Sequence, residues 1–104
     1  MTPVRVQETA ALRIDEIYRY SRERWGEAQA DAYVTGLFEA FEGIAKGAVA
    51  SRPVSAEFGV HGYVFRYRRH FVYWKTLSDG GIGIVTVLHE RMHQIGRFLE
   101  DHEP

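Results

Sequence analysis

The sequence predicts an α+β protein in which two helices precede a small antiparallel sheet. In the first half, apolar residues recur at helical spacing in two long stretches that a glycine separates. In the second half, aromatic and β-branched residues alternate with polar ones, and a Ser-Asp-Gly-Gly stretch is typical of a tight hairpin. Helices followed by strands, without regular alternation, favour an α+β fold over a parallel βαβ fold.

The composition indicates one globular domain, residues 1–104. The chain has 104 residues, of which 45% are hydrophobic, and this is enough for one packed core. It contains no cysteine, which excludes disulfides, thiolate metal sites and a cysteine nucleophile. The formal net charge of −1 favours neither nucleic acid nor a membrane as a partner. Without a signal peptide or a membrane span in the sequence, we expect a cytoplasmic protein.

The chain begins with a short predicted edge strand and an amphipathic helix. Val4 to Val6 follow a proline and form the predicted strand. Thr9 is a plausible N-cap, and the apolar spacing that follows predicts a helix over Ala10 to Arg24. Gly26 is the residue expected to end it.

A second apolar stripe predicts a second long helix over Ala30 to Ala45, ending near Gly47. Two long helices joined at a single glycine predict an antiparallel αα-hairpin. Gly47 to His61 contain a proline and scattered small residues, and we expect a loop there.

Three consecutive strands are predicted next, and they form an antiparallel meander. The first covers Tyr63 to Arg68, and Arg69-His70 permits a tight turn. Phe71 to Leu77 form the second strand, which the Ser-Asp-Gly-Gly hairpin connects to a third strand over Ile82 to Leu88.

A short terminal helix over Gln94 to Leu99 completes the predicted fold. The helical hairpin is expected to cover one face of the sheet. The opposite face is then expected to be either wet or covered by a partner.

The sequence HERMH, His89 to His93, matches most of a zinc-protease signature. In such enzymes the two histidines lie one turn apart within a helix, so that both rings reach one metal ion. Here His89 directly follows a predicted strand, where residues four apart lie about 13 Å from each other. Leu99 occupies the position of a metzincin third ligand. We therefore interpret the motif as a chance match and predict no metal site.

Basic and aromatic residues gather on the predicted strands and at their ends. Such a set can hold phosphates and stack bases, with arginine stabilising a developing charge and histidine transferring protons. Alternatively, the aromatic residues belong to the core and the bases line a wet rim. The residues concerned are Arg66, Arg68, Arg69, His70, Tyr73, Trp74, His89, Arg91 and His93.

Several stretches resemble the ParE-type toxins of the RelE/ParE superfamily from bacterial type II toxin–antitoxin systems. The helical hairpin carries Trp25-Gly26, Gln29-Ala30 and Tyr33. The second strand reads HFVYW, and the last strand ends in VLHERM, similar to the "ILHERM" of the family. The resemblance extends over nearly the whole chain, from Val4 to Leu99, in order and spacing.

The resemblance implies a RelE-like fold, in which an αα-hairpin packs on a small antiparallel sheet. It also implies a non-enzymatic toxin that inhibits DNA gyrase and is neutralised in a hetero-oligomer by a cognate ParD-like antitoxin. No cofactor and no direct contact with nucleic acid are implied. Family members often carry Asp at the position of His93, which supports the interpretation of HERMH as a chance match.

Two alternatives remain within the superfamily. One is a ribosome-dependent messenger endoribonuclease of the RelE type, to which Arg66, Arg68, His70 and Arg91 would supply the active groups. The other is an inactive protein that still binds antitoxin. Thr86 stands where relatives commonly have arginine on the last strand, which weighs against the ribonuclease and makes gyrase inhibition less certain.

The expected site residues form two sets. The antitoxin-binding set is aromatic and consists of Tyr20, Trp25, Tyr33, Tyr67 and Trp74. The target-binding set consists of Arg66, Arg68, Arg69, His70, His89, Arg91 and His93.

Overall fold

A computed structural model describes residues 2–49, 51–54 and 62–91 of the chain. The elements follow in the order β1 (Val4–Val6), α1 (Glu8–Trp25), α2 (Glu27–Ala45), β2 (Arg52–Pro53), β3 (Tyr63–Tyr67), β4 (His70–Thr76) and β5 (Ile82–His89). The predicted terminal helix over Gln94 to Leu99 lies outside the described residues. No helix in the described part of the chain is long and apolar enough to cross a membrane.

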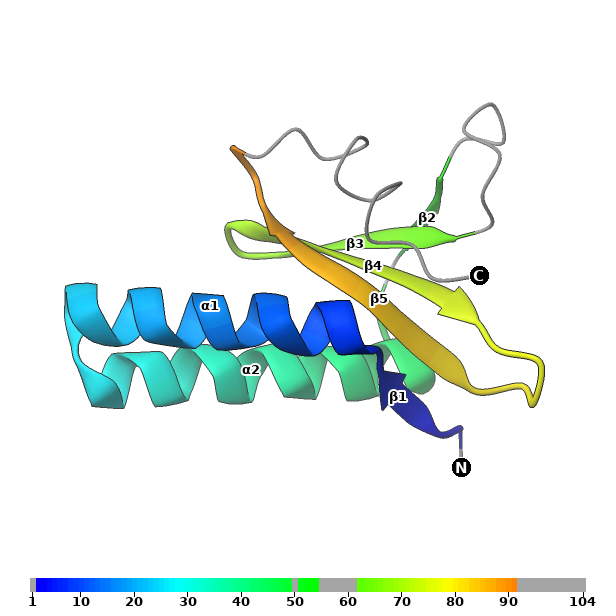
Figure 1. Cartoon of the computed structure of the whole chain (residues 1–104). Helices are drawn as coiled ribbons and strands as arrows, with labels where there is room; N and C mark the ends of the chain where they lie inside the picture. Colours follow the sequence, from blue (N-terminus) through cyan, green and yellow to red (C-terminus); the bar gives the residue numbers. More distant parts are fainter. Residues whose placement is uncertain (1, 50, 55–61, 92–104) are drawn as a thin grey trace.

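The two helices lie side by side on one face of a five-stranded sheet (Figure 1). The strand order is β1-β5-β4-β3-β2. The predicted meander of β3, β4 and β5 is confirmed, and β2 adds to it antiparallel. β1 is the predicted edge strand, and it pairs with β5 in parallel. The long connection that parallel pairing requires contains the helical hairpin and β2 to β4. The α+β prediction is therefore confirmed.

Helix α1 begins one residue earlier than Thr9 and ends at Trp25. Gln7, not Thr9, is the N-cap, and no side chain caps the helix. The N–H of Gln7 donates to the Ile84 carbonyl at 3.0 Å, which joins the start of the helix to β5. The buried stripe of α1 consists of Ala10, Ile14, Ile17 and Ser21.

Gly26 connects the helices at a backbone φ of 95°. This left-handed conformation favours glycine, which explains how a single residue reverses the chain. Helix α2 then buries Leu37 and Phe41 against the sheet, at 0% and 1% exposure. Its Phe38, which belongs to the predicted apolar stripe, stays 44% exposed.

The turns and the shortest strand differ from the sequence expectation. Arg68 and Arg69 form the β3–β4 turn, so that His70 is the first residue of β4. β2 is a two-residue strand within the predicted loop, too short to give an alternating pattern.

A bulge in β5 shifts the alternation by which its buried side chains face the two sides of the sheet. Tyr73 pairs with Thr86 and Trp74 pairs with Ile84, which leaves Val85 as the extra residue. Ile84 and Val87 face the helices, whereas Val85 and Leu88 pack with Tyr73 on the opposite face. All of these side chains are at most 2% exposed. The opposite face was expected to be either wet or covered by a partner, but its centre forms a second small core within the chain.

Candidate functional site

The predicted target-binding residues converge at one end of the sheet, where the β3–β4 turn lies beside the end of β5. The backbone joins the two segments, because Glu90 N–H donates to the Arg69 carbonyl at 2.9 Å. The arginines are exposed, and the histidines are half-buried. We call this set the basic end: Arg66, Arg68, Arg69, His70, His89 and Arg91. His93 lies outside the described residues.

Arg68 has an unusual backbone conformation, with a φ of 51°. It is the first residue of a two-residue hairpin turn, because Tyr67 pairs directly with His70. A positive φ at that position is typical of the type I′ and II′ turns of tight hairpins, which glycine favours. An arginine there costs about 1 kcal/mol, and strain of this kind tends to gather at functional positions.

The side chain of Arg66 lies on the face of the sheet opposite the helices. Its Nη2 forms an ion pair with a Glu90 carboxylate oxygen at 2.5 Å, and its Nε donates to the Arg68 carbonyl at 2.9 Å. The guanidinium carbon lies 5.2 Å from the centre of the Phe71 ring. Arg66 is therefore held in place and partly neutralised.

Two histidines and two tyrosines form a cluster on the helix face of the basic end. The Tyr33 hydroxyl and His70 Nδ1 are 2.6 Å apart, and the Tyr67 hydroxyl donates to the Tyr33 carbonyl at 3.1 Å. The rings of His70 and His89, which are partners across β4 and β5, lie 5.3 Å apart. The cluster ties α2 to β3, β4 and β5 at the basic end.

Burial determines the charge states in this cluster. Desolvation, together with the neighbouring His89, lowers the pKa of His70 to about 4, although Glu90 acts in the other direction. Desolvation also raises the pKa of Tyr33, so the phenol keeps its proton at neutral pH. At neutral pH His70 is therefore uncharged, and the positive charge of the basic end comes from its arginines.

The HERMH motif does not begin within a helix. His89 is the last residue of β5, and Glu90 and Arg91 form a turn. His89 Nδ1 accepts a hydrogen bond from the Arg91 backbone N–H at 3.1 Å, a local contact that ends the strand. Among the described residues, no three His, Cys, Asp or Glu side chains gather into a site that would hold a metal ion.

The predicted antitoxin-binding residues lie in three separate places. Tyr33 and Tyr67 belong to the cluster of the basic end. Tyr20 and Trp25 lie at the free end of the helical hairpin, where each is 57% exposed and their rings meet edge to face at 5.8 Å. This hairpin tip lies beyond the β3–β4 turn in Figure 1. Two large exposed aromatic side chains in contact are typical of an interaction surface.

Trp74 occupies the third place, near the other end of β4. Its ring stacks on Tyr63 with centroids 4.4 Å apart, and its Nε1–H donates to Ser51 Oγ at 3.0 Å. Trp74 also packs against the main core. Both the N–H and the ring of Trp74 thus have partners within the chain, which favours a structural role for this residue.

Thr86 is fully buried on the face opposite the helices. Its strand partner Tyr73 is buried beside it, at 2% exposure. Thr86 therefore contributes nothing to the exposed surface of this chain.

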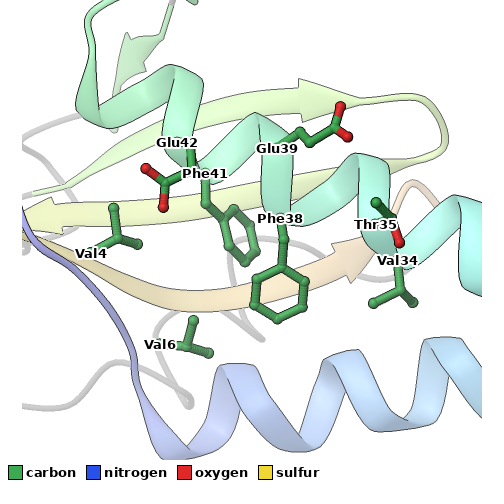
Figure 2. Close-up of a pocket in the computed structure, with 8 residues that line it drawn as sticks. All are labelled: Val4, Val6, Val34, Thr35, Phe38, Glu39, Phe41 and Glu42. Carbon is green, nitrogen blue, oxygen red and sulfur yellow. The ribbon is translucent and has the colours of Figure 1, made fainter.

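A groove between α2 and β1 was not found by sequence reasoning. Its volume is about 440 Å³, and Figure 2 shows the rings of Phe38 and Phe41 on the α2 side opposite Val4 and Val6 of β1. The complete lining is Val4, Val6, Val34, Thr35, Phe38, Glu39, Phe41 and Glu42. The wide apolar stripe of α2 is the sequence feature that could have predicted this groove, because contact with one face of a sheet does not bury so wide a stripe.

Comparisons with known proteins agree with this geometry. A family model described as the ParE toxin of the type II toxin–antitoxin system parDE matches residues 4–94. A solved structure described as the chromosomal ParDE toxin–antitoxin system from P. aeruginosa shares the fold with a TM-score of 0.70 at 16% sequence identity, over 86% of this chain and 96% of that chain. No curated protein matches the sequence.

Proposed function

The chain belongs to the ParE toxins of type II toxin–antitoxin systems, and on that premise we propose that it arrests growth by binding and inhibiting DNA gyrase, without catalysis of its own. A cognate ParD-like antitoxin neutralises it in the cytoplasm by forming a hetero-oligomer. The family match over residues 4–94 is the observation that carries this proposal.

The basic end is the surface that we assign to the target. It presents exposed arginines at the end of the sheet, and two of them, Arg68 and Arg69, form the β3–β4 turn. The formal net charge of the whole chain is −1. A local basic surface on a near-neutral protein suits an acidic protein surface better than a nucleic acid backbone, which requires wider positive charge.

The antitoxin is assigned first to the hairpin tip. Tyr20 and Trp25 are exposed and contact each other, and they lie at the opposite end of the helices from the groove at β1. An antitoxin that wraps the chain can reach this tip without displacing any core residue.

A supercoiling assay tests gyrase inhibition. Purified chain added to purified gyrase and relaxed plasmid is expected to suppress supercoiling in a dose-dependent manner, and premixing the chain with antitoxin is expected to restore it. Normal supercoiling at a large excess of the chain would reject gyrase as the target.

Charge reversal of the turn tests the basic end. Arg68→Glu with Arg69→Glu is expected to weaken gyrase inhibition at least tenfold, because it reverses the charge that faces the target. Antitoxin binding at the hairpin tip is expected to be retained, because the only change is at the exposed turn. Arg19→Glu with Arg22→Glu, at two exposed positions of α1, changes the net charge equally and is the matched control, which is expected to inhibit like the unmodified chain. Equal inhibition by all three proteins would remove the basic end from the contact surface.

The ribonuclease alternative receives little support from the side-chain geometry. Arg66 lies on one face of the sheet with Glu90, whereas His70 lies on the other face with Tyr33. A general acid or base and a charge-stabilising arginine must reach the same phosphate. Intact messenger after incubation of the chain in a translating extract is the expected result, and site-specific cleavage that Arg91→Ala abolishes would favour the ribonuclease instead.

A further inference from the structure

The β3–β4 turn of the basic end is supported on the helix side by one residue of α2, Tyr33. The two exposed arginines of the turn, Arg68 and Arg69, lie between Tyr67 and His70, which pair directly with each other. The ring of Tyr33 contacts both of these flanking residues edge to face. Its centre lies 5.2 Å from that of the Tyr67 ring and 5.5 Å from that of the His70 ring. Tyr33 therefore spans the base of the turn.

Hydrogen bonds reinforce these ring contacts. The Tyr33 hydroxyl lies 2.6 Å from His70 Nδ1, and the Tyr67 hydroxyl donates to the Tyr33 carbonyl at 3.1 Å. Tyr67 can approach α2 this closely because residue 36 is a glycine, and a Cβ at Gly36 would clash with the Tyr67 hydroxyl oxygen. The side chain of Tyr67 is thus fixed by α2 both at its ring and at its hydroxyl.

The Tyr67 ring in turn supports a side chain of the surface that we assign to the target. The guanidinium carbon of Arg68 lies 5.7 Å from the centre of this ring, in a cation–π contact. An exposed arginine loses rotamer freedom when it binds a partner, and this loss opposes binding. An arginine that already rests on an immobile ring loses less. The contacts therefore form one series, from Tyr33 through Tyr67 to Arg68.

We infer that Tyr33 is a positioning residue for the target surface: it immobilises the Tyr67 ring and thereby holds the Arg68 guanidinium ready to meet an acidic group of the target. This inference rests on the proposed function, because it names the residue that prepares the basic end for gyrase. Tyr33 acts through its neighbours and does not touch the target itself. It also packs against the main core, and positioning and packing predict different experimental results.

Nuclear Overhauser contacts in the free chain test the positioning without gyrase. Contacts from the Arg68 side chain to the Tyr67 ring are expected in the unmodified chain, and Tyr33→Leu is expected to abolish them. Tyr18→Leu is the matched control, because it removes another helix tyrosine, whose hydroxyl donates to Asp31 at 2.9 Å, and is expected to leave these contacts intact. Absence of the contacts from the unmodified chain, or their persistence in Tyr33→Leu, would overturn the inference.

The supercoiling assay tests the consequence for gyrase. Tyr33→Leu is expected to raise the concentration needed for half inhibition at least fivefold, with each protein counted by its folded fraction. Tyr33→Phe, which keeps the ring against Tyr67, is expected to stay within twofold of the unmodified chain, as is Tyr18→Leu. Equal inhibition by Tyr33→Leu and the unmodified chain would overturn the inference and leave gyrase as the target. Absence of inhibition by every protein would instead overturn the proposed function, and the Overhauser contacts would still decide the positioning.

A double-mutant cycle separates positioning from packing. In an Arg68→Ala background, Tyr33→Leu is expected to weaken gyrase inhibition by less than a further twofold, because the side chain that Tyr33 positions is already absent. A further fivefold loss would show that Tyr33 acts through packing alone and would overturn the inference. If Tyr33→Leu does not fold, Tyr67→Leu removes the same support one contact closer to Arg68, with the same expected losses in each measurement.

Discussion

At the scale of single residues, the two most informative positions are those at which the local environment opposes the residue present. Arg68 holds a left-handed backbone conformation that favours glycine, and His70 is half-buried beside a second histidine. Sequence reasoning placed both residues in the candidate site. It did not predict their conformation or charge state, because each depends on partners brought in by the β3–β4 register and by α2.

Arg68→Gly is expected to stabilise the fold by about 0.5–1 kcal/mol, because glycine adopts a φ of 51° without strain. The same substitution is expected to weaken gyrase inhibition through the lost charge. Chemical denaturation measures the first effect, and the supercoiling assay measures the second. A destabilised variant would show that the contact of the Arg68 guanidinium with the Tyr67 ring, at 5.7 Å, outweighs the strain.

The fold is expected to lose stability as the pH falls below 6.5, because the pKa of His70 is lowered from 6.5 to about 4. Between these two pH values the unfolded chain takes up a proton more readily than the folded chain. The free energy of unfolding is therefore at its full value above pH 6.5 and decreases toward pH 4. Allowing for solvent screening of this half-buried group, the loss attributable to His70 between pH 7 and pH 5 is about 1 kcal/mol. The groups that face it are His89, Glu90 and Tyr33.

Denaturation curves at both pH values, for the unmodified chain and for His70→Asn, isolate this contribution. The asparagine carbonyl can still accept from the Tyr33 hydroxyl, but it does not titrate. We expect a smaller decrease in stability for the variant. An identical decrease in both proteins would assign the pH dependence to other groups.

At the scale of secondary-structure elements, the helices and the three long strands could be predicted from the sequence because each carries a full period of its own pattern. β2 could not, because Arg52–Pro53 is too short to show alternation. The N-cap was misplaced because Gln7 is fixed by a bond to β5, and no local pattern reports such a contact. The bulge at Val85 was also beyond prediction, since a continuous apolar run hides which side chain faces which layer.

The close approach of Tyr67 in β3 to Gly36 in α2 leads to a prediction for the substitution of this glycine. A Cβ added there would clash with the Tyr67 hydroxyl oxygen and lie 3.3 Å from Tyr67 Cζ. Gly36→Ala is therefore expected to destabilise the chain by about 1–2 kcal/mol, although alanine is the better helix former. Thermal or chemical denaturation measures the difference.

The Tyr67→Phe background serves as the control for that prediction. With the hydroxyl removed, the cost of Gly36→Ala is expected to fall below about 0.5 kcal/mol, because the clashing atom is absent. An unchanged cost in this background would mean that Gly36 is needed for a reason other than the approach of Tyr67.

At the scale of the whole molecule, the sites that the sequence predicted are distributed over separate surfaces. The basic end and the hairpin tip come from different element junctions, and the groove at β1, which the sequence did not predict, lies at a third. From the sequence, the site residues were grouped by residue type. The fold instead places Tyr20 with Trp25, Tyr33 with Tyr67, and Trp74 apart from both pairs. Only the tertiary arrangement of hairpin and sheet determines which members of a set meet.

Trp25→Ala tests the hairpin tip as an interaction surface. Because Trp25 is 57% exposed and lies outside the core, the substitution is expected to change stability by less than about 0.5 kcal/mol. It is expected to weaken antitoxin binding at least tenfold, as measured by calorimetric titration. Leu12→Ala removes an apolar side chain that is 59% exposed on the same helix and is the matched control. Equal affinity for all three proteins would exclude the tip from the antitoxin contact.

The pairing of β1 with β5 has a consequence for synthesis on the ribosome. The first strand of the chain finds its only partner among the described residues in the last one, Ile82–His89. That last strand also supplies Ile84, Val85 and Leu88, each at 0% exposure, to the two cores. A nascent polypeptide halted before residue 82 therefore lacks the interior on which its helices would pack. Interrupted translation of this message yields unfolded, inert fragments, and the poison is complete only when its reading frame has been read almost to the end.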